Sequence, residues 1–137
     1  MTPQTVPPIL TLPSDLRLLP VARAFVEGVC QAGGLSKDLT NAVVVAADEA
    51  VNNIIRHAHR NDTALTLRIE CRVGPDCVEV RLQDEGEPFD LSTVPKLDPA
   101  EVRIGGRGVY LMRALMDEVY CEACPPRGNL LRLIKRR

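Results

Sequence analysis

Four polar residues lie inside an otherwise apolar, strongly helical run at residues 41–60: Asp48, Glu49, Asn52 and Asn53. A helix this rich in Ala, Val and Ile must pack on at least one face, and buried carboxylates or amides there need a metal, a ligand or hydrogen-bond partners. Glu49 and Asn53 are four residues apart and share one helix face, whereas Asp48 and Asn52 share the adjacent face. We therefore expect one of these pairs to face a pocket.

A second polar residue in an unexpected place, Asp84, follows a predicted strand. Residues 64–73 alternate between apolar and polar side chains, and residues 78–82 repeat the alternation after a Gly-Pro-Asp turn. This pattern predicts two half-buried antiparallel strands joined as a hairpin. When the alternation is continued, the Asp84 carboxylate falls on the apolar side, directly before the sequence Glu-Gly-Glu-Pro.

The third feature is a glycine-rich segment, residues 105–108, which precedes a helix predicted from apolar residues at core spacing. Free N–H groups at a glycine-lined helix start form an anion site, to which the helix dipole adds a little. The preceding residues, about 85–105, show no period and contain Pro95 and Pro99. Because loops of this length are usually functional or disordered, we interpret the segment as a lid.

The remaining elements are predicted from helical spacing, strand alternation and the positions of Gly and Pro. They are a loose N-terminus (1–8), an edge strand around residues 9–12, a helix from about Pro20 to Ala32 that is ended by Gly33, a central helix capped by Ser36 and reaching about His57, and strands at residues 119–123 and 130–134.

Composition limits the function classes. The chain has 137 residues, 45% of them hydrophobic, which fits a single domain with a real core. The net charge of −1, from 17 basic and 18 acidic residues, gives no sign of a nucleic-acid or membrane surface. No apolar stretch approaches the roughly 20 residues needed to span a bilayer, and the N-terminus lacks a secretory pattern, so we expect a cytoplasmic protein.

The five cysteines are odd in number and scattered, which favours reduced thiols over a disulfide framework. Cys121 and Cys124 form a Cys-x-x-Cys pair, so a zinc site with Cys71 and Cys77 has to be considered. Strand alternation disfavours such a site, because Cys71 falls on the apolar face of its strand and Cys77 on the polar face of the next.

A bound nucleotide explains the three features together. The glycine-rich turn would take the phosphates, and Asn53 would offer a neutral oxygen to a phosphate-bound Mg²⁺. Asp84 would accept a hydrogen bond from a base amino group, and Glu49 would take a proton from an attacking hydroxyl or water. The chain lacks the P-loop motif and has no Gly-x-Gly-x-x-Gly in a parallel unit, which argues against the other common nucleotide folds.

Three motifs in this order resemble a known family. Residues 49–53 with His57 resemble the N box of the GHKL ATPases, a superfamily that includes gyrase, MutL and histidine kinases, while residues 84–88 and 106–112 resemble its first and second glycine boxes. Within this superfamily, the chain is most similar to the RsbW and SpoIIAB type of anti-sigma factor serine kinase. The likeness lies in its small size, in the helix before the N box and in residues 115–119, where the helix after the second glycine box ends. The resemblance covers nearly the whole chain.

The resemblance implies an α+β fold, a two-layer α/β sandwich of the Bergerat type, with helices on one face of a mostly antiparallel sheet and ATP with Mg²⁺ between helices and lid. It also implies site roles. Glu49 would be the catalytic base and Asn53 the magnesium ligand. Asp84 and Gly86 would contact the adenine, and Gly106 and Gly108 the phosphates. Arg103 or Arg107 would reach the terminal phosphate, and further nucleotide contacts would come from Asn52, His57 and Val109.

The expected partners also come from the resemblance. The substrate would be a Ser or Thr of a STAS-domain anti-anti-sigma protein, and a homodimer of the kinase would hold a sigma factor or other regulator. One departure is Asn129, which stands where the family often has a Thr beside the adenine. Asn129 shares the strand alternation of Leu131, so its side chain can point inward and replace the Thr by hydrogen bonding.

Two alternatives to the kinase remain open. The first is a nucleotide-dependent binding module that sequesters a regulator without phosphate transfer, and the second, weaker one is a free-standing ATPase. The acid at position 49 favours the kinase, because binding alone does not need a base.

Overall fold

The computed structural model describes residues 6–86 and 106–137. Its elements, in chain order, are β1 (Ile9–Pro13), a 3-10 turn (Leu16–Leu18), α1 (Leu19–Ala32), α2 (Lys37–Asn53), a π-helix (Ile54–Ala58), β2 (Thr66–Val73), β3 (Cys77–Asp84), α3 (Gly106–Leu115), β4 (Glu118–Ala123) and β5 (Asn129–Arg136). Most of the predicted lid, residues 87–105, lies outside the described residues, as does the start of the loose N-terminus.

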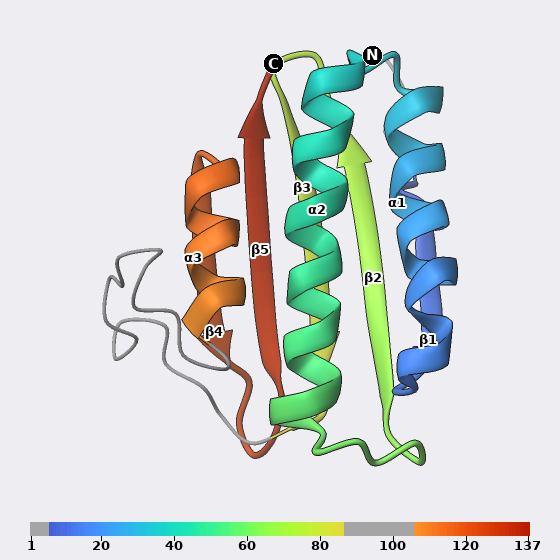
Figure 1. Cartoon of the computed structure of the whole chain (residues 1–137), viewed down its shortest axis with the longest axis vertical. Helices are drawn as coiled ribbons and strands as arrows, with labels where there is room; N and C mark the ends of the chain where they lie inside the picture. The colour runs from blue at the N-terminus through green and yellow to red at the C-terminus, as the bar shows by residue number, and fades with distance from the viewer. Residues whose placement is uncertain (1–5, 87–105) are drawn as a thin grey trace.

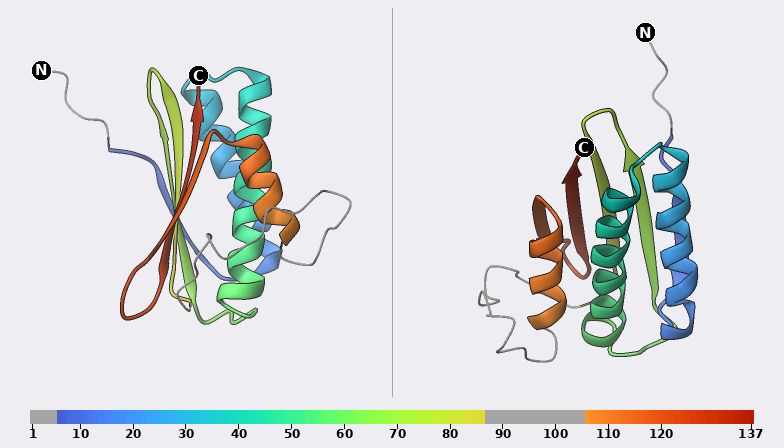
Figure 2. Two further views of the ribbon diagram at one scale, coloured as in Figure 1. Left: turned by 90° about the vertical axis from the view of Figure 1, so that its left-hand side faces the viewer. Right: turned by 45° about the horizontal axis from the view of Figure 1, so that its top comes forward.

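The strands form one antiparallel sheet in the order β1-β2-β3-β5-β4. Helices α1, α2 and α3 lie side by side over one face of this sheet, with α2 in the middle (Figure 1). Seen edge-on, all three helices are on the same side (Figure 2). The prediction of an α+β sandwich with a mostly antiparallel sheet is therefore confirmed.

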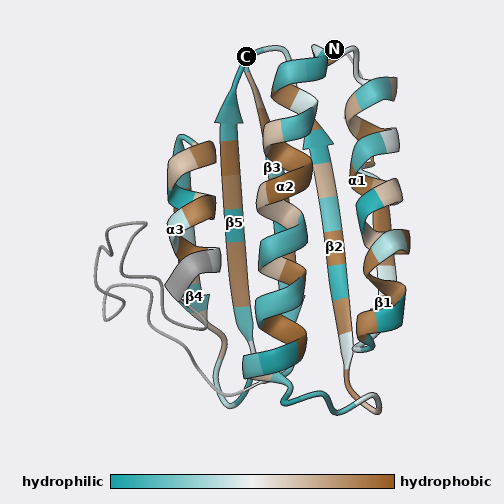
Figure 3. Cartoon of the chain, viewed as in Figure 1, coloured by the Kyte–Doolittle hydropathy of each residue, from teal (hydrophilic) through white to brown (hydrophobic). Residues whose placement is uncertain are grey.

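The core lies between the two layers. Alternate residues of β2 and β3 point toward the helices and are at most 1% exposed, namely Leu67, Ile69, Cys71, Val78, Val80 and Leu82. Apolar and polar residues alternate along β2 (Figure 3). Full burial of a side chain of this size contributes roughly 1.5–3 kcal/mol, so the two inner strand faces are a major source of stability.

Helix α2 begins where the sequence predicts and ends differently. The Ser36 hydroxyl accepts a hydrogen bond from the Leu39 N–H at 3.3 Å, which is an N-cap. After Asn53 the helix widens into the π-helix, in which the His59 N–H donates to the Ile54 carbonyl, five residues earlier, at 2.8 Å. The wider turn changes which side chains after Asn53 face the sheet.

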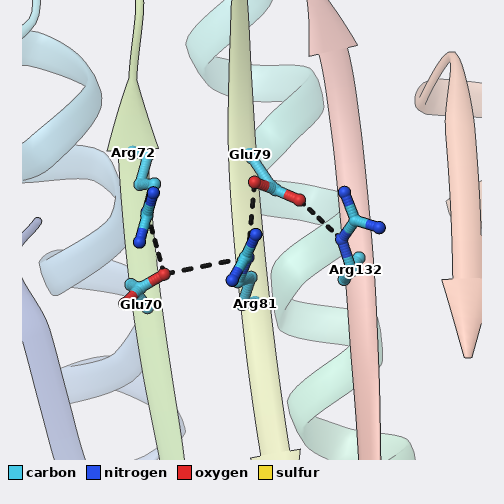
Figure 4. Close-up of polar contacts among 5 residues, drawn as sticks. All are labelled: Glu70, Arg72, Glu79, Arg81 and Arg132. Atoms are coloured by element: carbon cyan, nitrogen blue, oxygen red, sulfur yellow. Dashed lines mark hydrogen bonds and ion pairs between the residues drawn. The ribbon is translucent and has the colours of Figure 1, made fainter. Parts of the chain in front are cut away.

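The face of the sheet opposite the helices carries a row of charged side chains. We call this the outer-face ladder, and it consists of Glu70, Arg72, Glu79, Arg81 and Arg132 (Figure 4). Glu70 contacts Arg72 at 3.0 Å and Arg81 at 3.8 Å, while Glu79 contacts Arg81 at 3.3 Å and Arg132 at 2.7 Å. These charges form ion pairs across β2, β3 and β5, although Nε of Arg81 is buried and has no hydrogen-bond partner among the described residues.

Within the described ranges, none of the helices combines the length and apolar character that crossing a bilayer requires.

Candidate functional site

The Asp48 side of α2 is occupied by contacts within the chain. The Asp48 carboxylate accepts hydrogen bonds from the Arg23 guanidinium of α1 at 3.1 and 3.2 Å. The Asn52 side-chain oxygen accepts one from Nε of Arg56 at 2.8 Å. Both polar groups therefore have partners on the helices themselves, although the predicted nucleotide contact of Asn52 stays a prediction.

The Glu49 side of α2 faces the start of α3. A Cβ added to Gly108 would lie 2.6 Å from Nδ2 and 3.1 Å from Oδ1 of Asn53, so the α3 backbone lies directly against this amide. Glu49 is half-buried, one helical turn from Asn53, and its carboxylate has no hydrogen bond or ion pair with any residue that the structure describes. The second glycine motif is therefore brought to the Glu49 and Asn53 pair.

Asp84 points to the helix side of the sheet, as the strand alternation predicts, and is 6% exposed. Its Oδ1 accepts hydrogen bonds from the Gly86 N–H at 2.8 Å and from Nδ2 of Asn129 at 3.2 Å. Asn129 is opposite Asp84 in the β3–β5 register and is 2% exposed, which confirms that it points inward. Oδ2 of Asp84 accepts no hydrogen bond from the described residues and can accept one from a ligand.

Two glycines allow three segments to meet beside Asp84. The Gly128 N–H donates to the Gly86 carbonyl at 2.8 Å. A Cβ at Gly86 would lie 2.5 Å from the Ala58 carbonyl oxygen, and one at Gly128, whose φ is +107°, would lie 2.6 Å from the Asp84 carbonyl oxygen. The end of the π-helix, the end of β3 and the β4–β5 turn thus contact one another through backbone, with no space for side chains.

A buried histidine that was not predicted from the sequence lies next to this site. His59 is 2% exposed; its Nε2 accepts the Glu85 N–H at 3.0 Å and its Nδ1 lies 2.8 Å from the Ser14 hydroxyl oxygen. Burial lowers the pKa of His59, and the nearby Asp84 and Glu85 carboxylates oppose that shift. The motif resemblance indicated His57 instead, which is exposed in the structure.

A sequence signal for His59 did exist in β1. Leu10, Leu12 and Ser14 share one alternation, so a hydroxyl follows two core-facing residues. Ser14 is fully buried in the structure. A buried hydroxyl needs a hydrogen-bond partner, and a search for that partner would have pointed to a second buried polar side chain such as His59.

The other predicted site residues are placed as follows. Val109 is 4% exposed and packs in the core beneath the start of α3. Gly106 is the first residue of α3. Arg103 lies outside the described residues, and so does the side chain of Arg107. Their predicted phosphate contacts stay predictions.

The described residues fit an adenine nucleotide with Mg²⁺. Oδ2 of Asp84, which has no donor among the described residues, is an acceptor suited to an exocyclic amino group. The Asn53 amide offers the kind of hard oxygen that Mg²⁺ takes from proteins, usually one or two per site alongside phosphates and water. The α3 backbone reaches the same amide with no Cβ between them, which suits phosphate bound by N–H groups at a helix start.

Comparisons with known proteins show the family to which the chain belongs. A family model described as the histidine kinase-like ATPase domain matches residues 12–135. The serine-protein kinase RsbW of Listeria innocua is 31% identical over 118 residues, which are 80% of this chain and 75% of that protein. The protein of the same name from Bacillus subtilis is 30% identical, covering 80% of this chain and 74% of its own length.

Solved structures show the same fold. A crystal structure of the RsbU and RsbW domains of a Mycobacterium tuberculosis protein has a TM-score of 0.67 at 19% identity, covering 96% of this chain and 32% of that longer chain. A histidine kinase domain from Erythrobacter litoralis has a TM-score of 0.55 at 14% identity, covering 83% of this chain and 60% of that one. The chain belongs to the histidine kinase-like ATPase domain family, as do the serine-protein kinase RsbW proteins that it resembles. This family lies within the GHKL superfamily that the three motifs indicate.

Proposed function

We propose that this protein is an ATP-dependent serine/threonine kinase that acts as an anti-sigma factor and phosphorylates a STAS-domain anti-anti-sigma protein. The observation that carries the proposal is the Glu49 carboxylate, which has no partner among the described residues and lies one helical turn from an amide that α3 contacts. The relatives of this chain are named serine-protein kinase RsbW, which supports a serine kinase activity.

In this proposal ATP lies between α2, the end of β3 and the start of α3. Asp84, with the Gly86 backbone, contacts the adenine, while Gly106 and Gly108 contact the phosphates. Asn53 holds Mg²⁺, which neutralises the phosphate charge during transfer. Further contacts proposed on the motif resemblance are Asn52, His57, Arg103, Arg107, Val109 and Asn129.

Glu49 acts as the general base. It accepts the proton of the attacking Ser or Thr hydroxyl as the new bond from that oxygen to the γ-phosphorus forms and the bond between phosphorus and the β–γ bridging oxygen breaks. The products are the phosphorylated partner and ADP. The half-buried position of Glu49 suits this role, because it gives the carboxylate contact with a docked hydroxyl while limiting competing water.

The proposed cellular arrangement is a cytoplasmic homodimer that holds a sigma factor and exchanges it for the STAS-domain protein. It rests on the likeness to the RsbW proteins and extends to this chain the role that the motif resemblance implies.

Transfer of labelled phosphate from ATP to a STAS-domain protein of the source organism tests the proposal. We expect Glu49→Gln to lower the transfer rate by roughly 10²–10⁴ while nucleotide affinity is kept. Asp48→Asn is the matched control, since it changes the adjacent acid, which pairs with Arg23, and we expect transfer at close to the wild-type rate.

Two outcomes would overturn the proposal. Nucleotide binding with no transfer by the wild-type protein to any STAS-domain protein of the organism would indicate the alternative, a nucleotide-dependent module that sequesters a regulator. Equal loss of transfer in the Glu49 and Asp48 variants would show that Glu49 has no special role as base.

A further inference from the structure

His59 connects three segments of the chain at the edge of the proposed nucleotide site. It follows the π-helix, its Nδ1 is 2.8 Å from the hydroxyl of Ser14 at the end of β1, and its Nε2 is 3.0 Å from the backbone nitrogen of Glu85 after β3. The next residue, Gly86, donates to Asp84 and accepts from Gly128. A change at His59 therefore reaches the Asp84 contacts through a single peptide unit.

The hydrogen bonds determine the protonation state of the imidazole. A backbone N–H can only donate, so Nε2 must accept from Glu85 and carry no proton. The single ring proton is then on Nδ1 and is donated to the Ser14 hydroxyl oxygen. A second proton on Nε2 would place two N–H groups against each other and break the bond to Glu85.

We propose that His59 is a positioning residue that, only while neutral, holds the backbone at Glu85 and Gly86 in the conformation that binds nucleotide, so that acidification weakens nucleotide binding through this side chain. The inference rests on the proposed nucleotide site and adds a control by pH to it. His59 itself touches no part of the nucleotide in this account, since it acts through the Glu85 backbone.

Charged groups from each neighbouring segment act on His59. Asp84 is the last residue of β3 and Glu85 follows it, Asp62 lies in the loop after the π-helix, and Arg127 lies in the β4–β5 turn. The three carboxylates favour the imidazolium and raise the pKa of His59, whereas burial and Arg127 lower it. Burial has the largest effect, so the pKa lies below its ordinary value of 6.5 and the neutral form dominates at neutral pH.

Calorimetric titration with Mg²⁺ and ADP at about pH 8 and about pH 5.5 tests the proposal. Between the higher and the lower pH, we expect the fold-loss of ADP affinity to be roughly ten times larger in the wild type than in His59→Gln. The glutamine side-chain oxygen accepts the Glu85 N–H but cannot be protonated. The comparison between variants removes the contribution of the nucleotide's own titrating phosphates.

The outcomes separate this inference from the proposed function. Absence of ADP binding by the wild-type protein at the higher pH would overturn the proposed function and, with it, this inference. Binding with the same pH ratio in the wild type and His59→Gln would overturn only the inference.

A second measurement remains decisive even where His59→Gln does not fold. Nitrogen-15 NMR of the wild-type imidazole distinguishes the two tautomers and the cation. We expect the Nδ1–H tautomer at neutral pH, with protonation only below 6.5, the ordinary pKa of the side chain. An Nε2–H tautomer or an imidazolium at neutral pH would contradict the proposal.

Discussion

Asp48 and Glu49 are neighbours in α2, yet they lie in opposite surroundings. Asp48 accepts two hydrogen bonds from Arg23 and ties α2 to α1. Glu49 has no described partner and lies on the side of α2 where Gly108 contacts Asn53. One side of the helix uses its polar residues to hold the fold together, and the other leaves them available for a ligand.

The outer-face ladder extends the comparison to the sheet. Its carboxylates and guanidinium groups are paired with one another on a face without helices (Figure 4). Asp84, on the opposite face, is buried and has one oxygen with two donors and the other with none among the described residues. Incomplete pairing alone is not specific, since Oγ1 of Thr40 and Nε of Arg81 are also buried without a hydrogen-bond partner among the described residues. We assign Asp84 to function because its unpaired oxygen lies beside the first glycine motif.

The largest expected effect on nucleotide affinity comes from Asp84→Asn. The amide oxygen keeps the hydrogen bonds from Gly86 and Asn129, but the amide nitrogen replaces the oxygen that is free to accept from adenine. We expect adenine nucleotide affinity to fall roughly 100-fold, measured by calorimetry. Asp48→Asn is the control and should leave that affinity unchanged; equal losses in both variants would break the comparison.

A smaller loss of affinity is expected for Gly108→Ala. The added methyl group would overlap the Asn53 amide, which must rotate away from the position where it is proposed to hold Mg²⁺. We expect affinity for nucleotide with Mg²⁺ to fall roughly tenfold. The control is Gly28→Ala, where no atom lies within 4 Å of the new Cβ.

Gly28 is an exposed position inside α1, so alanine should leave nucleotide affinity unchanged and raise the free energy of unfolding by about 0.5–1 kcal/mol. Loss of affinity in the Gly28 variant, or none in the Gly108 variant, would contradict the assignment of the two sites.

The buried site should also give stability a pH dependence. Because the pKa of His59 is lowered in the folded state, the unfolded chain takes up a proton first as the pH falls. The stabilising contribution of neutral His59 is therefore fully present above 6.5, the unfolded value, and is lost as the pH falls from there through the lowered folded value.

Urea unfolding midpoints between about pH 7.5 and about pH 5.5 measure this effect. We expect the wild-type midpoint to fall across this range and His59→Gln to lessen the fall. A midpoint that rises with acidification in the wild type would show that the imidazolium is the favoured form.

The smallest effect is expected on the outer face. Glu79→Gln removes the ion pairs with Arg81 and Arg132 on a partly solvated surface. We expect the free energy of unfolding to fall by at most about 1 kcal/mol, less in high salt, with nucleotide affinity unchanged. Denaturation at two salt concentrations measures this, and a loss of several kcal/mol would show that the ladder is essential to the fold.

Much of the fold follows from the sequence because its signals are local. Alternation fixes the inner faces of β2 and β3 and places Asp84 and Asn129 inward, and Ser36 starts α2 as predicted. The spacing of Glu49 and Asn53 shows that they share a face. It does not show which of the two polar faces of α2 packs against α1, since that depends on tertiary pairing with Arg23.

The exposed His57 was chosen from the resemblance to the N box, and α-helical spacing does not anticipate the π-helix after Asn53 that precedes His59. The wider turn places His59 inward, where it pairs with Ser14, 45 residues away in the chain. Contacts between distant segments, such as that of Gly86 with Ala58, leave no periodic trace in the sequence. The positioning of the site was therefore less predictable than the residues that form it.

A crystal structure of this chain with a non-hydrolysable ATP analogue and Mg²⁺ tests the central claim most directly. We predict that the adenine amino group donates to Oδ2 of Asp84, that the metal binds the Asn53 amide oxygen, and that the Glu49 carboxylate faces the γ-phosphate. An analogue bound elsewhere, or one held on the Asp48 side of α2, would contradict the account.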